Sequence, residues 1–165
     1  MKDISFVYHG DCGHATSEAD GIGSGIESAN EVAAILIAID QDAESADSDW
    51  QALDASTSIV FGSPTCMGMA SLQFKNFADA TSKRWFSQDW KNKIAAGFTN
   101  WTSMNGDKHS TLHCFMAPAM QHSMLWGGTC LMLSDTRAAR RDDINYPGSF
   151  GGLMAQSPSD AGTHE

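Results

Sequence analysis

The sequence predicts an α/β protein with a doubly wound parallel sheet. Short apolar runs typical of buried strands alternate along the chain with segments in which apolar residues recur at helical spacing. This alternation is typical of a parallel sheet that has helices on both faces. The chain has 165 residues, with no internal repeat and no linker-like stretch. We therefore expect one domain, formed by residues 1–158, and a disordered tail at 159–165.

Five apolar runs are the predicted strands. They are rich in Ile, Val, Leu, Phe and Ala, and each is followed by polar or turn-forming residues. They comprise residues 4–8, 32–39, 58–61, 94–98 and 124–133. Gly127 and Gly128 interrupt the fifth run, and the chain beyond it is expected to be mostly loop.

Helical spacing fills three of the intervals between these strands, over residues 16–30, 72–84 and 109–121. In a shorter interval, Asp49 can cap a single turn after an acidic surface loop. The first helix contains three glycines, each of which costs about 1 kcal/mol relative to alanine, so this helix is weak on its own. Pro118 lies inside the last helix and is expected to bend or break it.

Composition and charge exclude several classes of protein. The formal net charge of −10 argues against nucleic-acid binding through phosphate neutralisation. No apolar run approaches the roughly 20 residues of a membrane span, and the N-terminus lacks a signal-peptide pattern, so we expect a cytoplasmic protein. The four cysteines form no CxxC pair and are expected to be reduced thiols.

Three polar, glycine-containing loops follow the first, third and fourth predicted strands, at residues 8–16, 62–68 and 99–107. The carboxyl ends of parallel strands meet at one edge of the sheet, where ligands of such folds bind. Glycines allow the backbone to approach a ligand closely, and a helix N-terminus can receive a phosphate without a cation. The sequence therefore predicts one binding pocket at this edge.

Three segments carry a resemblance to a known family. They are "VYHGDCGHAT" after the first strand, "FGSPTCMG" after the third, and "NYPGSFGGLMAQSP" near the end. With these segments the chain resembles the flavodoxin-like NAD(P)H:quinone oxidoreductases, the family that includes the tryptophan-repressor-binding protein. The resemblance extends from residue 4 to about residue 158.

The resemblance implies a flavodoxin-like five-stranded sheet of order 2-1-3-4-5 that holds FMN non-covalently. It implies an NAD(P)H:quinone oxidoreductase in which FMN takes hydride from NADH or NADPH and passes two electrons to a quinone-like acceptor, by a ping-pong mechanism. It also implies a homodimer or homotetramer. The alternative hypothesis is a non-enzymatic flavodoxin-type electron carrier or FMN-binding module. This alternative includes a degenerate member of the family, in which FMN binding is weakened.

The resemblance also assigns site residues, loop by loop. Around the FMN phosphate it places Gly10, Asp11, Cys12, Gly13, His14 and Ala15. Beside the isoalloxazine ring it places Pro64, Thr65, Cys66, Met67 and Gly68. On the other side of the ring it places Thr99, Asn100, Trp101, Thr102, Ser103 and Gly106. His122 matches an active-site histidine, and Trp85 an aromatic residue that approaches the ring from a neighbouring subunit.

The chain departs from the family pattern at several positions. Gly10 and Ala15 stand where serine and threonine usually donate hydroxyls to the phosphate, and Trp101 stands where a small residue is usual. Each lost neutral hydrogen bond is worth about 1 kcal/mol, so FMN binding is expected to be weaker. The C-terminal helix that covers one sheet face in the family has no counterpart in the printed sequence. We therefore expect an exposed apolar face, which either a partner subunit covers or which lowers the stability of the fold.

Other motifs favour less specific interpretations. The run "GIGSGI" lacks the spacing of a dinucleotide fingerprint and lies within a predicted helix. Cys12, His14 and Cys66 are candidate metal ligands without motif spacing, so we expect no metal and assign them to the pocket lining. His109 and His113 lack the glutamate of a zinc helix, which favours an exposed pair.

Overall fold

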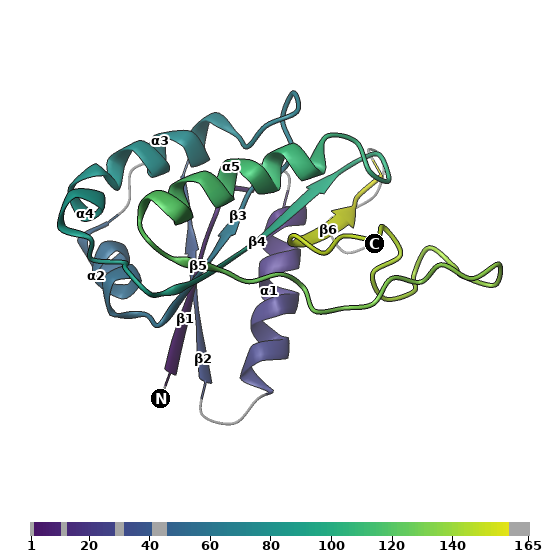
Figure 1. Cartoon of the computed structure of the whole chain (residues 1–165), viewed down its shortest axis with the longest axis horizontal. Helices are drawn as coiled ribbons and strands as arrows, with labels where there is room; N and C mark the ends of the chain where they lie inside the picture. The colour runs from purple at the N-terminus through teal and green to yellow at the C-terminus, as the bar shows by residue number, and fades with distance from the viewer. Residues whose placement is uncertain (1, 11–12, 29–31, 41–45, 159–165) are drawn as a thin grey trace.

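A parallel sheet of six strands forms the centre of the protein (Figure 1). The computed structural model describes residues 2–10, 13–28, 32–40 and 46–158. The strand order is β2-β1-β3-β4-β5, as predicted, and β6 also pairs with β4. The strands are β1 (Lys2–Tyr8), β2 (Val32–Ala38), β3 (Ser58–Gly62), β4 (Ile94–Trp101), β5 (Leu125–Trp126) and β6 (Leu153–Gln156).

The fifth strand position of the sheet is filled by two separate pieces of chain. β5 pairs with Ile94 and Ala95, at the start of β4, and β6 pairs with the last four residues of β4. Between them, residues 127–152 leave the sheet and form an irregular excursion that extends away from the body (Figure 1). The predicted strand over residues 124–133 is therefore wrong beyond Trp126, because the chain leaves the sheet at Gly127 and Gly128. The chain beyond is mostly loop, as expected, apart from β6, a short strand of four residues.

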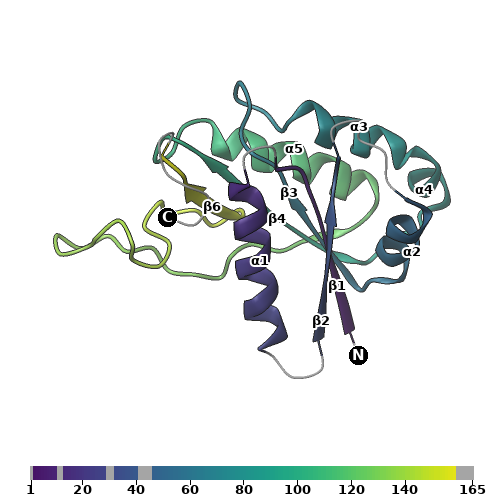
Figure 2. The ribbon, with the colours of Figure 1, turned by 180° about the vertical axis from the view of Figure 1, so that it is seen from behind.

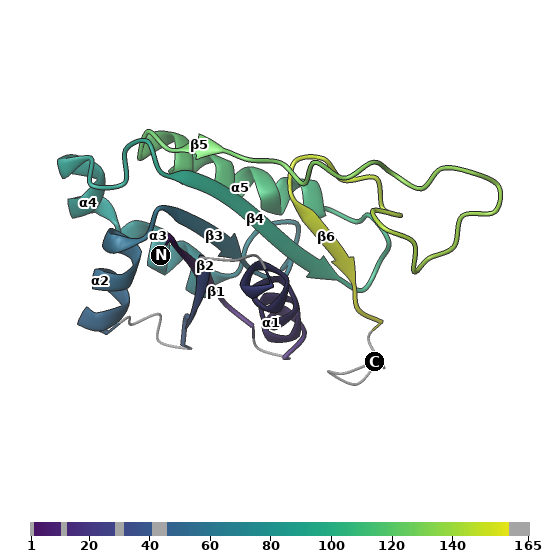
Figure 3. The same ribbon diagram turned by 90° about the horizontal axis from the view of Figure 1, so that it is seen from below.

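The helices lie on both faces of the sheet. Figures 2 and 3 show α1 alone on one face and α5 on the opposite face, beside α3. The helices are α1 (His14–Glu27), α2 (Asp47–Ala55), α3 (Leu72–Ala80), α4 (Ser82–Ser87) and α5 (Lys108–Gln121). None of the helices in the described ranges is long and apolar enough to cross a membrane.

Two apolar clusters hold these layers together. The larger contains Phe61, Phe74 and Phe115, whose rings meet edge to face between β3, α3 and α5. The smaller lies under α1 and includes Phe6 and Phe98. Because buried apolar area is the main source of folding free energy, the α5 face provides most of the stability.

The α1 face is only partly covered. Ile94 pairs with Leu125 across β4 and β5, so their side chains point to the same face, and both are more than half exposed. Their exposure agrees with the expected apolar surface on one sheet face. The described residues after β6 contain no helix, and the predicted disordered tail lies outside the described residues.

Three helices differ in detail from the sequence expectation. The predicted helix 72–84 is two helices, because the chain turns at Thr81, whose hydroxyl donates to the Ala78 carbonyl. A break at Pro118 was wrong, since α5 continues to Gln121. Pro118 has no N–H to donate to the Cys114 carbonyl, so α5 continues to Gln121 with one fewer backbone hydrogen bond. Asp49 is not the cap that was predicted: α2 is a full helix with Ala46 at its N-cap, and Asp49, the third helical residue, accepts the Ala46 backbone N–H at 3.1 Å.

Candidate functional site

The loops that leave β1, β3 and β4 surround a cavity of about 350 Å³ at the carboxyl edge of the sheet. Eight of the residues assigned by sequence line it: Gly10, His14, Ala15, Pro64, Cys66, Asn100, Trp101 and Thr102. Ser157 and Pro158, which follow β6, complete the lining. The structure therefore brings together parts of all three predicted loops and adds a fourth segment.

The N-terminus of α1 opens toward this cavity. Gly13 precedes the helix in the left-handed conformation, with φ of 78°, and as the N-cap residue it offers no side chain to the first turn. The first turn also contains no acidic residue. The first backbone N–H groups of a helix have no partner within the helix and carry the positive end of its dipole, so this end suits an anion. Asp11 and Cys12, also assigned to this loop, lie outside the described residues.

Gly10 leaves little room for the hydroxyl donor that its family position usually carries. A Cβ atom there would lie 3.2 Å from the Ala15 Cβ and 3.3 Å from the Thr16 Oγ1. The Thr16 side chain hydrogen-bonds to Tyr8, whose phenol pKa is raised mainly by burial. Thr16 follows Ala15, and its hydroxyl is the nearest group that could replace the serine and threonine donors of the family. This hydroxyl, however, already takes part in a hydrogen bond with Tyr8.

The loop after β3 is a tight two-residue turn. Cys66 and Met69 exchange backbone hydrogen bonds of 2.8 and 3.1 Å, and Met67 and Gly68 between them both have positive φ. Two successive left-handed residues are characteristic of a type I′ hairpin turn. The Met67 side chain is 98% exposed, so it projects from the tip and does not line the cavity.

Three threonine hydroxyls support this loop from below. The Thr111 hydroxyl donates to the Thr65 Oγ1 at 2.9 Å, and the Thr65 and Thr99 Oγ1 atoms lie 3.0 Å apart. All three side chains are buried. Thr65 and Thr99 therefore join β3, β4 and α5 in the interior, and only their neighbours face the cavity.

The loop after β4 closes around Trp101. Gly106 has a φ of 45°, and a Cβ there would lie 3.1 Å from the Trp101 Cδ1. The Trp101 side chain is partly exposed and lines the cavity. The chain after β6 supports this loop, because the Ser157 N–H donates to the Trp101 carbonyl and the Gln156 Nε2 donates to the Thr102 carbonyl. Ser103 and Gly106 do not line the cavity.

His122 and Trp85 lie elsewhere. His122 follows the last residue of α5, whereas the loop cavity lies near the start of this 14-residue helix, about 20 Å away at 1.5 Å per residue. The His122 Nε2 lies 2.9 Å from the Thr81 Oγ1, and its ring packs on Trp90. Burial lowers the pKa of His122, which favours the neutral ring. Neither His122 nor Trp85 lines the loop cavity of its own chain.

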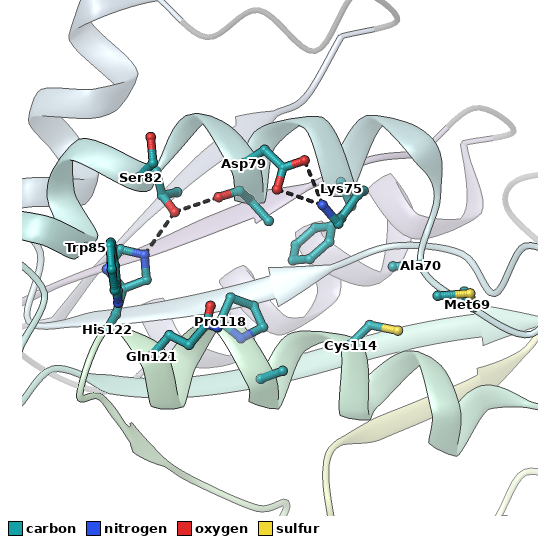
Figure 4. Close-up of a pocket in the computed structure, with 14 residues that line it drawn as sticks. Met69, Ala70, Lys75, Asp79, Ser82, Trp85, Cys114, Pro118, Gln121 and His122 are labelled. Atoms are coloured by element: carbon teal, nitrogen blue, oxygen red, sulfur yellow. Dashed lines mark hydrogen bonds and ion pairs between the residues drawn. The ribbon is translucent and has the colours of Figure 1, made fainter.

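These two residues instead share a larger groove, of about 590 Å³, between α3, α4 and α5. Figure 4 shows Trp85 and His122 at one end of the groove and Met69 and Cys114 at the other, with the Lys75–Asp79 ion pair on the α3 side. Trp85 is about half exposed. Most of the remaining lining is apolar, which suits contact with another apolar surface.

The alternative metal readings receive no support from the described residues. No three His, Cys, Asp or Glu side chains within them are close enough to hold a metal ion. His14 and Cys66 both line the loop cavity, and Cys12 lies outside the described residues. The His109 and His113 rings lie 4.3 Å apart on the exposed side of α5, as an adjacent pair on successive turns.

Sequence reasoning missed Ser157 and Pro158 as lining residues. Both residues belong to the tail motif "GLMAQSP", which the sequence analysis had singled out. The sequence alone did not show that β6 pairs with β4, and this pairing is what brings the segment to the carboxyl edge of the sheet.

Comparisons with known proteins agree with this fold. No model of a known protein family matches the chain. Flavodoxin FldP of Pseudomonas aeruginosa is 40% identical over 161 residues, which cover 98% of this chain and 84% of the relative. An NAD(P)H dehydrogenase (quinone) of Trichlorobacter lovleyi is 23% identical over 92% of this chain and 82% of its own length.

Among solved structures, a WrbA-like flavodoxin from Agrobacterium tumefaciens superposes with a TM-score of 0.76 and 39% identity. The match covers 95% of this chain and 84% of that protein. Together with the strand order 2-1-3-4-5, these similarities show that the chain belongs to the flavodoxin-like family.

Proposed function

We propose that the chain binds FMN non-covalently in the loop cavity and transfers electrons through it. The observation that carries this proposal is the cavity itself, formed where three strand ends and the N-terminus of α1 meet. Its volume of about 350 Å³ falls in the range of small-molecule sites. Bound FMN would supply hydride and electron-transfer chemistry, and the protein would supply binding and orientation.

The donor groups present fit such a ligand. The backbone N–H groups at the start of α1 would hold the phosphate, with Gly10 and Gly13 allowing the backbone to come close. Pro64 and Cys66 on one side, and Asn100, Trp101 and Thr102 on the other, would flank the flat ring. Because Gly10 and Ala15 provide no hydroxyl, we expect an affinity below that of sites with serine and threonine there.

A titration with FMN and riboflavin, followed by flavin fluorescence, tests this proposal. His14→Glu places a carboxylate on the first residue of α1, where it favours the helix dipole but repels a phosphate. We expect this variant to keep its thermal stability and its riboflavin affinity, and to lose FMN affinity by about tenfold or more. Absence of saturable FMN binding in the unmodified protein would refute the proposal.

A flavodoxin-type electron carrier is the reaction class we favour. FldP is named a flavodoxin and is the relative whose 40% identity spans nearly the whole chain. In addition, His14 and Cys66 are the ionisable side chains among the described residues that line the loop cavity, and His122 is not among the lining residues. A carrier needs only an accessible cofactor edge, and it would show little direct NAD(P)H turnover.

An NAD(P)H:quinone oxidoreductase is the second candidate. Relatives named NAD(P)H dehydrogenase (quinone) favour it, as does the apolar groove that holds Trp85. In a homodimer or homotetramer, this groove of one subunit would lie against the loop cavity of another and bring Trp85 to the cofactor and a quinone-like acceptor. Light scattering gives the subunit count. NADH or NADPH oxidation with a quinone then separates the candidates, and Trp85→Ala should lower turnover without weakening FMN binding if the enzyme proposal holds.

A further inference from the structure

Glu18 is an acidic side chain inside the protein, one turn behind the proposed phosphate site. Both carboxylate oxygens are shielded from solvent, and neither accepts a hydrogen bond from the described residues. Buried carboxyl groups are normally hydrogen-bonded or paired, so an unpartnered one calls for a physical explanation. The proposed cofactor-binding residues do not include Glu18.

The position of Glu18 on α1 explains its burial. Glu18 lies three residues after the buried Ala15 and four before Ile22, in the apolar stripe of the helix that packs on the sheet. This placement directs a carboxyl group into a position where an apolar side chain would be expected.

Lys108 supplies the opposite charge. It is the first residue of α5, is fully buried, and donates from Nζ to the Met104 carbonyl at 2.9 Å. An ammonium has three donors, and a helix N-terminus is an unfavourable place for a cation. Lys108 stabilises the charged form of Glu18, and Glu18 does the same for Lys108. Each residue thus lies just behind one of two cavity loops, at the starts of α1 and α5.

We propose that Glu18, with Lys108, is a proton-linked switch that couples FMN affinity to pH. Protonated Glu18 would leave the positive N-terminus of α1 free to hold the phosphate, whereas ionised Glu18 would repel it from within the same helix. The inference rests on the proposed binding of FMN at α1.

The direction of the effect follows from charge and distance. Glu18 lies four residues after His14, about 6 Å along the helix axis, and the interior between them is not screened by salt. Burial raises the pKa of Glu18 to about 8, so the group is mainly neutral at pH 7. A bound phosphate dianion disfavours a second negative charge. Affinity is therefore constant near pH 7 and falls as the pH rises beyond 8.

The surrounding charges do not reverse this direction. Burial, opposed by Glu18 and assisted by Arg141, lowers the pKa of Lys108 to about 8, so Lys108 loses its positive charge in the same range. Loss of that charge also weakens phosphate binding, and the two groups titrate as a pair. On the other packed elements, Tyr8 faces Thr16 and Asp20, and β2 and β6 carry no ionisable side chain.

FMN affinity measured between pH 7 and 9.5 tests the switch, since a flavin phosphate is a dianion throughout this range. We expect the unmodified protein to bind about tenfold more weakly at pH 9 than at pH 7, a loss of about 1.4 kcal/mol of binding free energy shared between Glu18 and Lys108. Glu18→Gln keeps the shape and removes the proton, so its loss should be about threefold or less, the part due to Lys108. Asp20→Asn removes an exposed charge from the same helix and should retain the full tenfold loss.

Unfolding of the cofactor-free protein gives an independent measurement. Because the pKa of Glu18 is raised in the folded state, its favourable contribution is complete below the unfolded pKa of about 4.3 and is lost as the pH rises to about 8. The stability of the unmodified protein should therefore fall relative to Glu18→Gln between pH 5 and 8. If FMN affinity depends on pH in the same way in the unmodified protein and in Glu18→Gln, or if their free energies of unfolding change in parallel with pH, the switch is overturned and the proposed FMN binding is not. No FMN binding at any pH would overturn the proposed function and the switch with it.

Discussion

The buried threonine chain beneath the loop cavity allows a quantitative test of how the site is supported. Thr65 accepts a hydrogen bond from the Thr111 hydroxyl at 2.9 Å, which leaves its own proton to donate to the Thr99 Oγ1 at 3.0 Å. Thr65→Val has nearly the same shape but removes the hydroxyl that serves both neighbours. The variant therefore isolates the hydrogen bonds from the packing.

The expected cost follows from the burial of the two groups left behind. Thr65 is 2% exposed, and Thr99 and Thr111 are fully buried, so water cannot replace the lost partner. Two lost hydrogen bonds at about 1 kcal/mol each give a destabilisation of about 2 kcal/mol. For a domain of this size that corresponds to a fall of roughly 4–8 °C in Tm. Replacing all three threonines by valine leaves no unpaired partner, so the triple variant should be closer to the unmodified protein than the sum of the single losses.

Urea unfolding of the cofactor-free protein measures the free energy of unfolding of the single and triple variants. Thr65→Ser is the matched control because it keeps the hydroxyl. We expect the serine variant to lose less than half of what the valine variant loses. A neutral Thr65→Val, or a serine variant that is equally destabilised, would show that the hydroxyl chain does not support the loop. Strictly additive losses in the triple variant would contradict the coupling.

Three further substitutions test other parts of the structure by thermal or urea unfolding. Gly25→Ala should stabilise the protein by about 0.5–1 kcal/mol, because nothing lies within 4 Å of the added Cβ inside α1; a loss would mean that α1 is packed differently there. Gly62→Ala should destabilise it by about 3 kcal/mol, because the new Cβ would overlap the buried Phe98 ring; a neutral result would refute the close strand-end packing. Burial alone would raise the pKa of Asp54, but hydrogen bonds and charge from Arg84 lower it. Its stabilisation is therefore present above pH 4 and lost as the pH falls through the lowered pKa, so Asp54→Asn should cost about 1 kcal/mol at pH 7 and less below pH 4.

The loops of the candidate site were predictable because each follows a strand. The segments after β1, β3 and β4 are read directly from apolar runs that end in glycine and polar residues, and parallel strands place their carboxyl ends together. Individual orientations were not predictable. Thr65 and Thr99 turn inward and Met67 turns out, because hydrogen bonds to α5 and a tight turn decide which side chains face the cavity.

The catalytic assignments of His122 and Trp85 depended on resemblance alone. Spacing along the chain cannot show that α5 carries its last residues about 20 Å from the loops. A role for either residue at the cofactor therefore requires a second subunit, and remains a proposal.

The sheet order 2-1-3-4-5 was implied by the family resemblance. By itself, the sequence determined the fold class, the first four strands along the chain and the three loops at one sheet edge. These features follow from periodicity over a few residues and from the general rule that parallel strands place their carboxyl ends at the same edge of the sheet. Only the tertiary structure decided that the fifth strand position is divided between β5 and β6, that Ser157 and Pro158 reach the cavity, and that Glu18 lies near Lys108. Each depends on contacts between residues far apart in the chain, whose free energies no local pattern records.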